Sequence, residues 1–284
     1  MHQDSKDYGL RPLWKATLNV YAAFRQICRA HHLQFWAYSG TMIGAVRHQG
    51  FIPWDDDFDV LMPYPDYRLF LEVAEKELPA YLSLVTRENT PEFSYYYSKI
   101  QDTRKSVSDS VAKETGHPQS EGIFIDICPL YGSPDPHWYD GLRSICYRMR
   151  KNAVIKASFK TRRALLAHYL GKMVFWLSRL KTQADIDSFI HAEITEIPYE
   201  TASLVARYVD YHFKFCFRME RNWFDETVEV PFEDTTVPIP REYVKVLKVM
   251  FGDYMRLPPE SERCVTHSNC PPAPWKFGAT HSAR

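Results

Sequence analysis

The stretch Trp54-Asp55-Asp56-Asp57-Phe58-Asp59-Val60-Leu61-Met62 places four carboxylates directly in front of an apolar run. The segment 58–62 has the pattern of a strand. Side chains alternate between the two faces of a strand, so Asp57 and Asp59 are expected on one face, and Asp55 joins them if the extended backbone begins early. Carboxylates this close repel each other, and a hard divalent cation bound through oxygen removes the repulsion. A solvated acidic loop is the alternative for such a run.

A second expected strand, 123–128, carries one carboxylate, Asp126, among apolar residues. A carboxylate that is buried without a partner is costly, or its pKa rises until it is neutral. Sharing a cation with Asp57 and Asp59 would remove this cost. A neutral or arginine-paired aspartate in the core is the alternative.

A small-residue turn, Ser39-Gly40-Thr41, lies upstream of the carboxylates, between an expected strand and an expected helix. Such a turn can offer backbone N–H groups and a hydroxyl to a phosphate. Three basic side chains could offset phosphate charge: Arg47, His48 and Lys99. The competing interpretations are a surface salt bridge for Arg47, a structural or solvent-facing His48, and a sheet-edge position for Lys99.

The pattern of apolar residues predicts an α+β fold with a mixed sheet and a largely helical second half. Strands are expected at 34–38, 58–62, 82–86, 95–100 and 123–128, and helices at about 12–31, 42–46, 67–78, 141–180, 183–195 and 241–251. Residues 238–240 are expected to form a short strand or loop. We therefore predict three regions: a catalytic core at 1–135, a basic helical region at 136–230, and a C-terminal segment at 231–284 that packs back on the core.

The run from Tyr38 to Val60 strongly resembles the LicD family, as do the runs Phe124–Leu130 and Phe251–Pro259. A small turn, a carboxylate pair on a strand and a third carboxylate on a later strand form the active-site layout of the nucleotidyltransferase superfamily. The resemblance therefore implies a nucleotidyltransferase-like core. It also implies a phosphotransferase that moves phosphocholine from CDP-choline to a sugar hydroxyl on a lipid-linked precursor of teichoic acid or lipopolysaccharide, and it extends to the fukutin-type ribitol-phosphate transferases.

The resemblance also implies roles for individual residues. Mg²⁺ or Mn²⁺ would bind four carboxylates: Asp57, Asp59, Asp126 and Asp55. The turn Ser39-Gly40-Thr41 matches the superfamily's phosphate-binding turn. The acceptor hydroxyl, oriented or deprotonated by Asp126, would attack the distal phosphorus of the donor, and Arg47 or Lys99 would offset its charge. A choline head group would suit an aromatic cage, for which Trp54 and Tyr95-Tyr96-Tyr97 are candidates.

The charges of the chain are segregated. Lys and Arg total 35 and Asp and Glu total 35, yet residues 141–181 hold eleven basic and no acidic side chains. Their apolar neighbours have helical spacing, which favours a cationic amphipathic helix against an anionic membrane or a polyanionic acceptor. Its expected contacts are Arg148, Arg150, Lys151, Arg162 and Arg163. The alternative is a helix packed on the core with its basic face in water, and nucleic acid is not an expected partner because no binding motif accompanies the charge.

The first seven residues, Met1 to Asp7, have no apolar core, and no apolar run approaches the length of a membrane span. We expect a cytoplasmic protein that lies peripherally at the inner face of the cell membrane. Two further functions remain open: a nucleotidyltransferase that places a nucleoside monophosphate on a small molecule or protein, and a catalytically silent protein that binds the membrane surface.

Overall fold

The computed structural model describes residues 8–90, 93, 95–106, 122–135, 188, 190–192, 194–209, 214–263 and 265. The chain divides into two compact units. The first consists of residues 1–130 and 221–284, and the second of residues 131–220. The first unit is therefore built from two stretches of chain that are 90 residues apart in the sequence.

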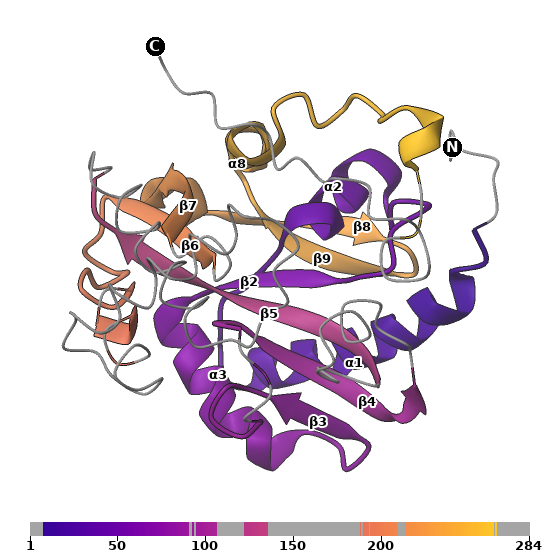
Figure 1. Ribbon diagram of the computed structural model, residues 1–284, viewed down its shortest axis with the longest axis horizontal. Coiled ribbons are helices and arrows are strands. Elements are labelled where there is room, and N and C mark those ends of the chain that lie inside the picture. Colours follow the sequence, from indigo (N-terminus) through magenta and orange to yellow (C-terminus); the bar gives the residue numbers. More distant parts are fainter. Residues whose placement is uncertain are drawn as a thin grey trace, which may run out of the picture. The chain divides into compact units, whose positions relative to one another are not determined.

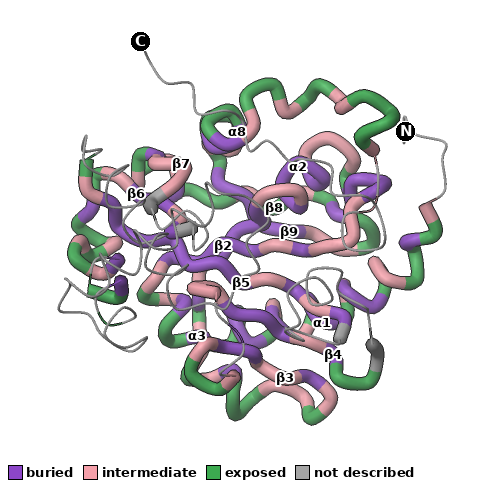
Figure 2. Tube along the Cα trace, viewed as in Figure 1, coloured by how far each residue is buried: buried purple, intermediate pink, exposed green. Residues whose placement is uncertain are grey.

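A mixed sheet forms the centre of the first unit (Figure 1). Its strands lie in the order β1 (Trp36–Ala37), β2 (Asp59–Pro63), β5 (Gly122–Ser133), β4 (Ser98–Ser106) and β3 (Leu82–Val85). Strands β2 and β5 are parallel and the other neighbours are antiparallel. Figure 2 shows how fully β2 and β5 are buried, as expected for the central strands of a sheet.

Two helices, α1 (Arg11–Ala30) and α3 (Tyr64–Glu77), contact each other and the sheet. The buried residues of α1 recur every three or four positions, which is the period of a helix with one apolar face. At its centre, the Phe24 ring lies 4.8 Å from that of Phe35 and 5.0 Å from that of Phe70. This aromatic cluster joins α1 to the start of the sheet and to α3.

The second stretch of the first unit adds a hairpin of β8 (Thr227–Phe232) and β9 (Thr235–Pro240), followed by α8 (Tyr243–Phe251). The hairpin contacts β1 and α2 (Ser39–His48). The Phe232 ring packs 4.9 Å from Phe51 and 5.4 Å from Phe58. The core is therefore complete only when both stretches of chain are present.

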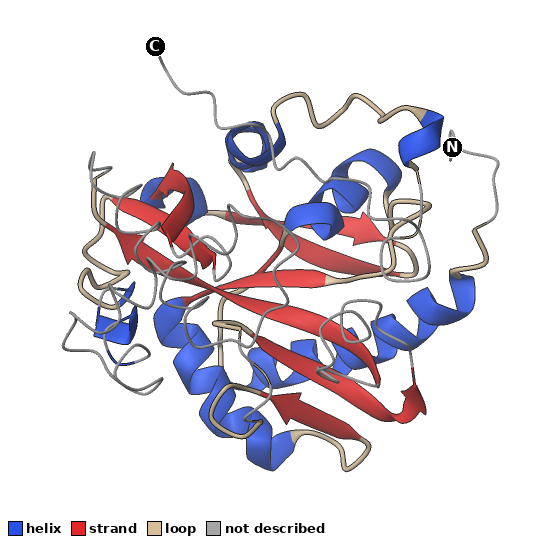
Figure 3. Ribbon diagram, in the orientation of Figure 1, coloured by secondary structure: helices blue, strands red, loops and turns tan. Residues whose placement is uncertain are grey.

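The prediction of a largely helical second half is wrong for the described residues. Their second half holds the hairpin β8–β9 and two antiparallel strands of the second unit, β6 (Leu204–Val209) and β7 (Lys214–Glu220), as Figure 3 shows. Pro231, Pro238 and Pro240 lie inside β8 and β9, and proline is a weak signal for a strand. The predicted helix at 141–180, and most of that at 183–195, lie outside the described residues.

The second unit contains β6, β7 and the last three residues of β5, Tyr131 to Ser133, which pair with β6. Arg218 on β7 donates hydrogen bonds to the Ser133 hydroxyl at 3.0 Å and to the Pro134 carbonyl at 3.2 Å. These bonds fix the end of β5 within that unit.

None of the described helices is both long and apolar enough to cross a membrane.

The aromatic contact between the two stretches of the first unit predicts the effect of Phe58→Ala. Phe58 is fully buried, and its ring lies 4.8 Å from that of Tyr21 as well as 5.4 Å from that of Phe232. Removing it should lower the free energy of unfolding by about 3–5 kcal/mol, measured by urea denaturation. Leu69→Ala, at a position that is 43% exposed, is the control and should leave the midpoint nearly unchanged. Equal midpoints for the two variants would contradict this description of the core.

Candidate active site

Two aspartates stand side by side on neighbouring parallel strands. Asp59 on β2 pairs in register with Asp126 on β5. Paired residues on adjacent strands are about 4.8 Å apart and project from the same face. The Asp126 N–H donates to the carbonyl of Phe58, the residue just before β2, at 2.9 Å. This bond fixes the pairing of Asp59 with Asp126. The structure thus brings two of the predicted site residues together.

Lys99 extends this row onto a third strand. It lies opposite Asp126 in the pairing of β4 with β5, and its Nζ is 3.2 Å from Oδ1 of Asp126. The Lys99 side chain is 6% exposed and that of Asp126 is 16% exposed. Nζ also lies 3.5 Å from the centre of the Phe124 ring. Lys99 therefore lies inside the sheet, not at its edge, and offsets the charge of Asp126.

The small-residue turn forms the first turn of α2 and supports the carboxylates from one side. The Asp59 N–H donates to the Thr41 hydroxyl oxygen at 2.8 Å. A Cβ atom at Gly40 would collide with the Asp55 carboxylate, so a larger residue here would require that side chain to move. The sequence of the turn is thus explained by its fit against Asp55 and Asp59, and the phosphate-binding role of Ser39, Gly40 and Thr41 stays a prediction.

The other carboxylates lie in the loop before β2, because the strand begins at Asp59 and not at 58. Asp55 and Asp57 share a hydrogen bond between their side chains. Loss of contact with water raises the pKa of Asp55 well above its usual value, and the charges of Asp57, Asp56 and Asp59 raise it further. The Asp55 carbonyl accepts a hydrogen bond from Nε1 of Trp14 at 2.8 Å, which fixes the loop to α1.

The chemistry of these donors suits a hard cation. All are carboxylate oxygens, the ligands that Mg²⁺ and Mn²⁺ prefer, and the pKa of Asp55 is raised first by burial and then by the neighbouring carboxylates. Within the described part of the chain, however, no three Asp, Glu, His or Cys side chains form a ready-made metal site. The carboxylate ligands therefore fit a metal ion in type, and they would have to move closer together to bind it.

Arg47 lies at the end of α2 and is held by two hydrogen bonds. Its Nη1 donates to the Tyr254 carbonyl at 2.8 Å, and its Nε donates to Nε2 of His48 at 2.9 Å. Burial lowers the pKa of Arg47, the nearby charge of Arg263 lowers it further, and Asp55 opposes both. Arg47 is therefore close enough to Asp55 and to the guanidinium group of Arg263 for both charges to affect its pKa.

Arg263 is a candidate site residue that sequence reasoning missed. Its guanidinium carbon lies 5.4 Å from the centre of the Trp54 ring, and its Nε donates to the Pro258 carbonyl at 2.9 Å. The ring of His48 approaches the same Trp54 ring edge-on at 6.4 Å. The run Phe251–Pro259 had directed attention to this segment, but Arg263 follows it without any periodic pattern to mark it.

The five basic residues expected at a membrane or acceptor, Arg148, Arg150, Lys151, Arg162 and Arg163, lie outside the described residues.

The chain is similar in sequence to a known protein family and to several known proteins. Residues 32–161 match the model of the LicD/FKTN/FKRP nucleotidyltransferase domain. The chain is 28% identical over 273 residues to a Haemophilus influenzae protein named lipopolysaccharide cholinephosphotransferase LicD, covering 92% of this chain and 97% of that protein. It is also 36% and 38% identical to uncharacterized proteins of Rickettsia typhi and Rickettsia prowazekii, over 62 and 55 residues that make up about a fifth of each.

The row of charges across three strands predicts energetic coupling between Lys99 and Asp126. Lys99→Met leaves a nearly buried carboxylate beside Asp59 and should cost about 3 kcal/mol of stability. Asp126→Asn leaves a buried ammonium and should also be costly, whereas the double variant should recover about 1–3 kcal/mol of the summed losses. Urea denaturation of the four proteins in metal-free buffer measures this coupling. Strictly additive losses would show that the two side chains do not interact.

Proposed function

The resemblance to the LicD family is confirmed, and from a chain that carries a LicD/FKTN/FKRP nucleotidyltransferase domain we propose a metal-dependent phosphotransferase. Its proposed reaction moves phosphocholine from CDP-choline to a sugar hydroxyl of a cell-surface glycan precursor. The observation that carries the proposal is the pairing of Asp59 with Asp126 on parallel strands, inside the matched domain. Similarity along nearly the whole chain to a protein named lipopolysaccharide cholinephosphotransferase supports lipopolysaccharide over teichoic acid as the acceptor class.

The carboxylates have different proposed roles. Asp57 and Asp59 would hold Mg²⁺ or Mn²⁺, with Asp55 and Asp126 as further ligands. The ion, when bound, would supply Lewis-acid stabilisation of charge on the phosphate oxygens. Asp126, fixed by Lys99 on the face of the sheet that it shares with Asp59, orients the acceptor hydroxyl and accepts its proton.

The donor's phosphates require cations beyond the metal. Arg47 and Arg263 lie beside Trp54 and the carboxylate loop, and we assign them to the charge on the diphosphate. Both are oriented through backbone carbonyls of residues 254 and 258, so the segment after α8 sets the position of both guanidinium groups.

The choline head group would lie on the aromatic rings that precede β4. The rings of Tyr95 and Tyr97 are stacked at 5.0 Å, and Nζ of Lys99 lies 5.8 Å from the centre of the Tyr97 ring. Tyr96 is covered by the guanidinium group of Arg87 at 4.4 Å, and Trp54 is only 4% exposed. Tyr95 is therefore the better candidate for a quaternary ammonium group, because Arg87 lies over Tyr96 and Lys99 lies over Tyr97.

The reaction is tested with CDP-choline that carries labels in both choline and cytidine, together with Mg²⁺ and a lipopolysaccharide acceptor. We expect CMP release and transfer of the choline label. Asp59→Asn should lower the rate about 100- to 1,000-fold, because it removes a negative charge that would hold the metal ion. Glu75→Gln, an exposed carboxylate on α3, is the matched control and should retain full activity.

Three results would contradict the proposal. Cytidine label on the acceptor would indicate nucleotidyl transfer. Full activity in the presence of EDTA would exclude the metal, and absence of turnover across CDP-choline, CDP-ribitol and CDP-glycerol would favour a silent binding protein.

The position of Arg263 predicts a defect in donor binding. Arg263→Ala should raise the KM for the CDP-linked donor about tenfold, since it removes a charge-assisted contact with phosphate, and Arg263→Lys should recover part of this loss. Arg256→Ala removes an exposed cation from the same segment and serves as control. Donor saturation curves provide the measurement. An unchanged KM in Arg263→Ala would remove this residue from the site.

A further inference from the structure

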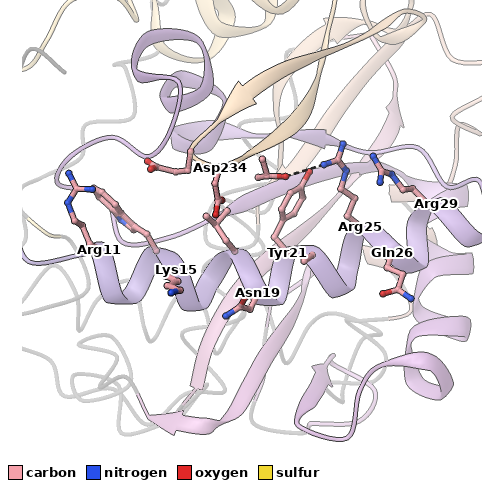
Figure 4. Close-up of a pocket in the computed structure, with 13 residues that line it drawn as sticks. Arg11, Lys15, Asn19, Tyr21, Arg25, Gln26, Arg29 and Asp234 are labelled. Carbon is pink, nitrogen blue, oxygen red and sulfur yellow. Dashed lines mark hydrogen bonds between the residues drawn. The ribbon is translucent and has the colours of Figure 1, made fainter. Parts of the chain in front are cut away.

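A groove of about 810 Å³ lies between α1 and the turn of the β8–β9 hairpin, all within the first unit (Figure 4). One wall is formed by α1. The other is formed by Glu233, Asp234 and Thr235, and Figure 4 shows Asp234 across the groove from the helix. No sequence pattern had singled out this place.

The helix presents four cations to the groove: Arg11, Lys15, Arg25 and Arg29. Successive cations are 4, 10 and 4 residues apart, and this spacing places all of them on one face of the helix. At a rise of 1.5 Å per residue, the first and last lie about 27 Å apart. The exposed Ala22 lies between the two pairs, and its small side chain leaves the middle of the face open.

Three of these cations have no carboxylate partner among the described residues. Arg25 is the exception, because its Nη2 lies 3.0 Å from Glu229 and its Nη1 donates to the Thr236 carbonyl at 3.1 Å. Arg11, Lys15 and Arg29 are exposed. The opposite wall carries two carboxylates: Glu233 accepts a hydrogen bond from the Phe51 N–H at 3.1 Å, and Asp234 is exposed. The α1 side of the groove thus carries positive charge that an anionic ligand can neutralise.

The remaining lining residues suit a sugar. Asn19 and Gln26 line the groove with amide groups, which Figure 4 shows on the side of α1 away from Asp234, and the indole of Trp14 is stacked on Phe51 at 5.1 Å. Amides can donate to and accept from hydroxyl groups, and an aromatic ring gives a flat surface for a sugar ring. The large exposed apolar residues of the described chain, Leu69, Val244, Val249 and Met255, are not among the residues that line the groove, so it has no such side chain to insert into a bilayer.

We infer that the groove between α1 and the β8–β9 hairpin binds a phosphate-bearing glycan, with phosphate on Arg11, Lys15 or Arg29 and sugar against Trp14, Asn19 and Gln26. Its assignment as part of the acceptor rests on the proposed function. Trp14 connects the groove to the carboxylate loop, because the same indole donates to the Asp55 carbonyl.

The test is calorimetric titration of the full chain, without donor or metal, with pentamannose 6-phosphate and with the same glycan after phosphatase treatment. We expect the phosphorylated glycan to bind more tightly, and high salt to weaken that binding. The double variant Arg11→Gln and Arg29→Gln should bind it about tenfold more weakly. Ala22→Trp keeps every charge but fills the groove and should abolish binding, whereas Lys248→Gln, an exposed cation on α8, should not change it.

Equal binding of the two glycans, equal affinity in all variants, or no binding at millimolar concentration in low salt would overturn the inference. A membrane would be the ligand instead if the wild-type chain bound anionic phosphatidylglycerol vesicles but not the phosphoglycan, and if the double variant lost the vesicle binding. That result would also overturn the inference. Metal-dependent CMP release measured on the same preparations separates the two hypotheses. Release without glycan binding would refute the groove alone, and glycan binding without release would refute the phosphotransferase alone.

Discussion

The proposed active site depends on two like charges being held next to each other. Asp59 and Asp126 project from paired positions on parallel strands, where the backbone ladder prevents them from moving apart. Lys99, on the far side of Asp126, offsets part of the repulsion, and the loop carboxylates Asp55 and Asp57 add to it. Such a cluster costs folding energy, and a divalent cation or a bound phosphate–metal complex is what would relieve it.

Groups from distant parts of the chain hold the acidic loop in place. Gly40 lets α2 reach Asp55, Trp14 bonds its carbonyl from α1, and Glu233 accepts the N–H of Phe51 at the start of the loop. The bonds of Trp14 and Glu233 are made to backbone groups, and the approach of α2 depends on the missing side chain of Gly40. The loop can therefore keep its shape while the charge on its carboxylates changes, as a site that binds and releases an anionic donor requires.

The sequence predicted the parts of the site better than their pairing. Alternation around Asp59 and Asp126 indicated two strands with outward carboxylates, but not that they are parallel neighbours, because register between strands more than 60 residues apart leaves no local pattern. Of the hairpin β8–β9, only residues 238–240 were expected as a short strand or loop, because its prolines disfavour strands. The helical second half was expected from the apolar spacing of residues 141–180 and 183–195. Arg263 lies in a segment without regular periodicity, and only its contact with Trp54 reveals it.

The division of the first unit into two stretches bears on how the protein is made. Phe51 and Phe58 are covered by Phe232, which follows the 90 residues of the second unit. At a synthesis rate of about 5–20 residues per second, that interval lasts roughly 5–20 s. During this time the nascent chain exposes the aromatic surface of Phe51 and Phe58, which a chaperone can cover until Phe232 has been synthesised. A chain truncated before Phe232 should therefore be prone to aggregation rather than fold into an enzyme of reduced activity. Slow translation through residues 131–220 would lower the yield of folded protein without changing its stability.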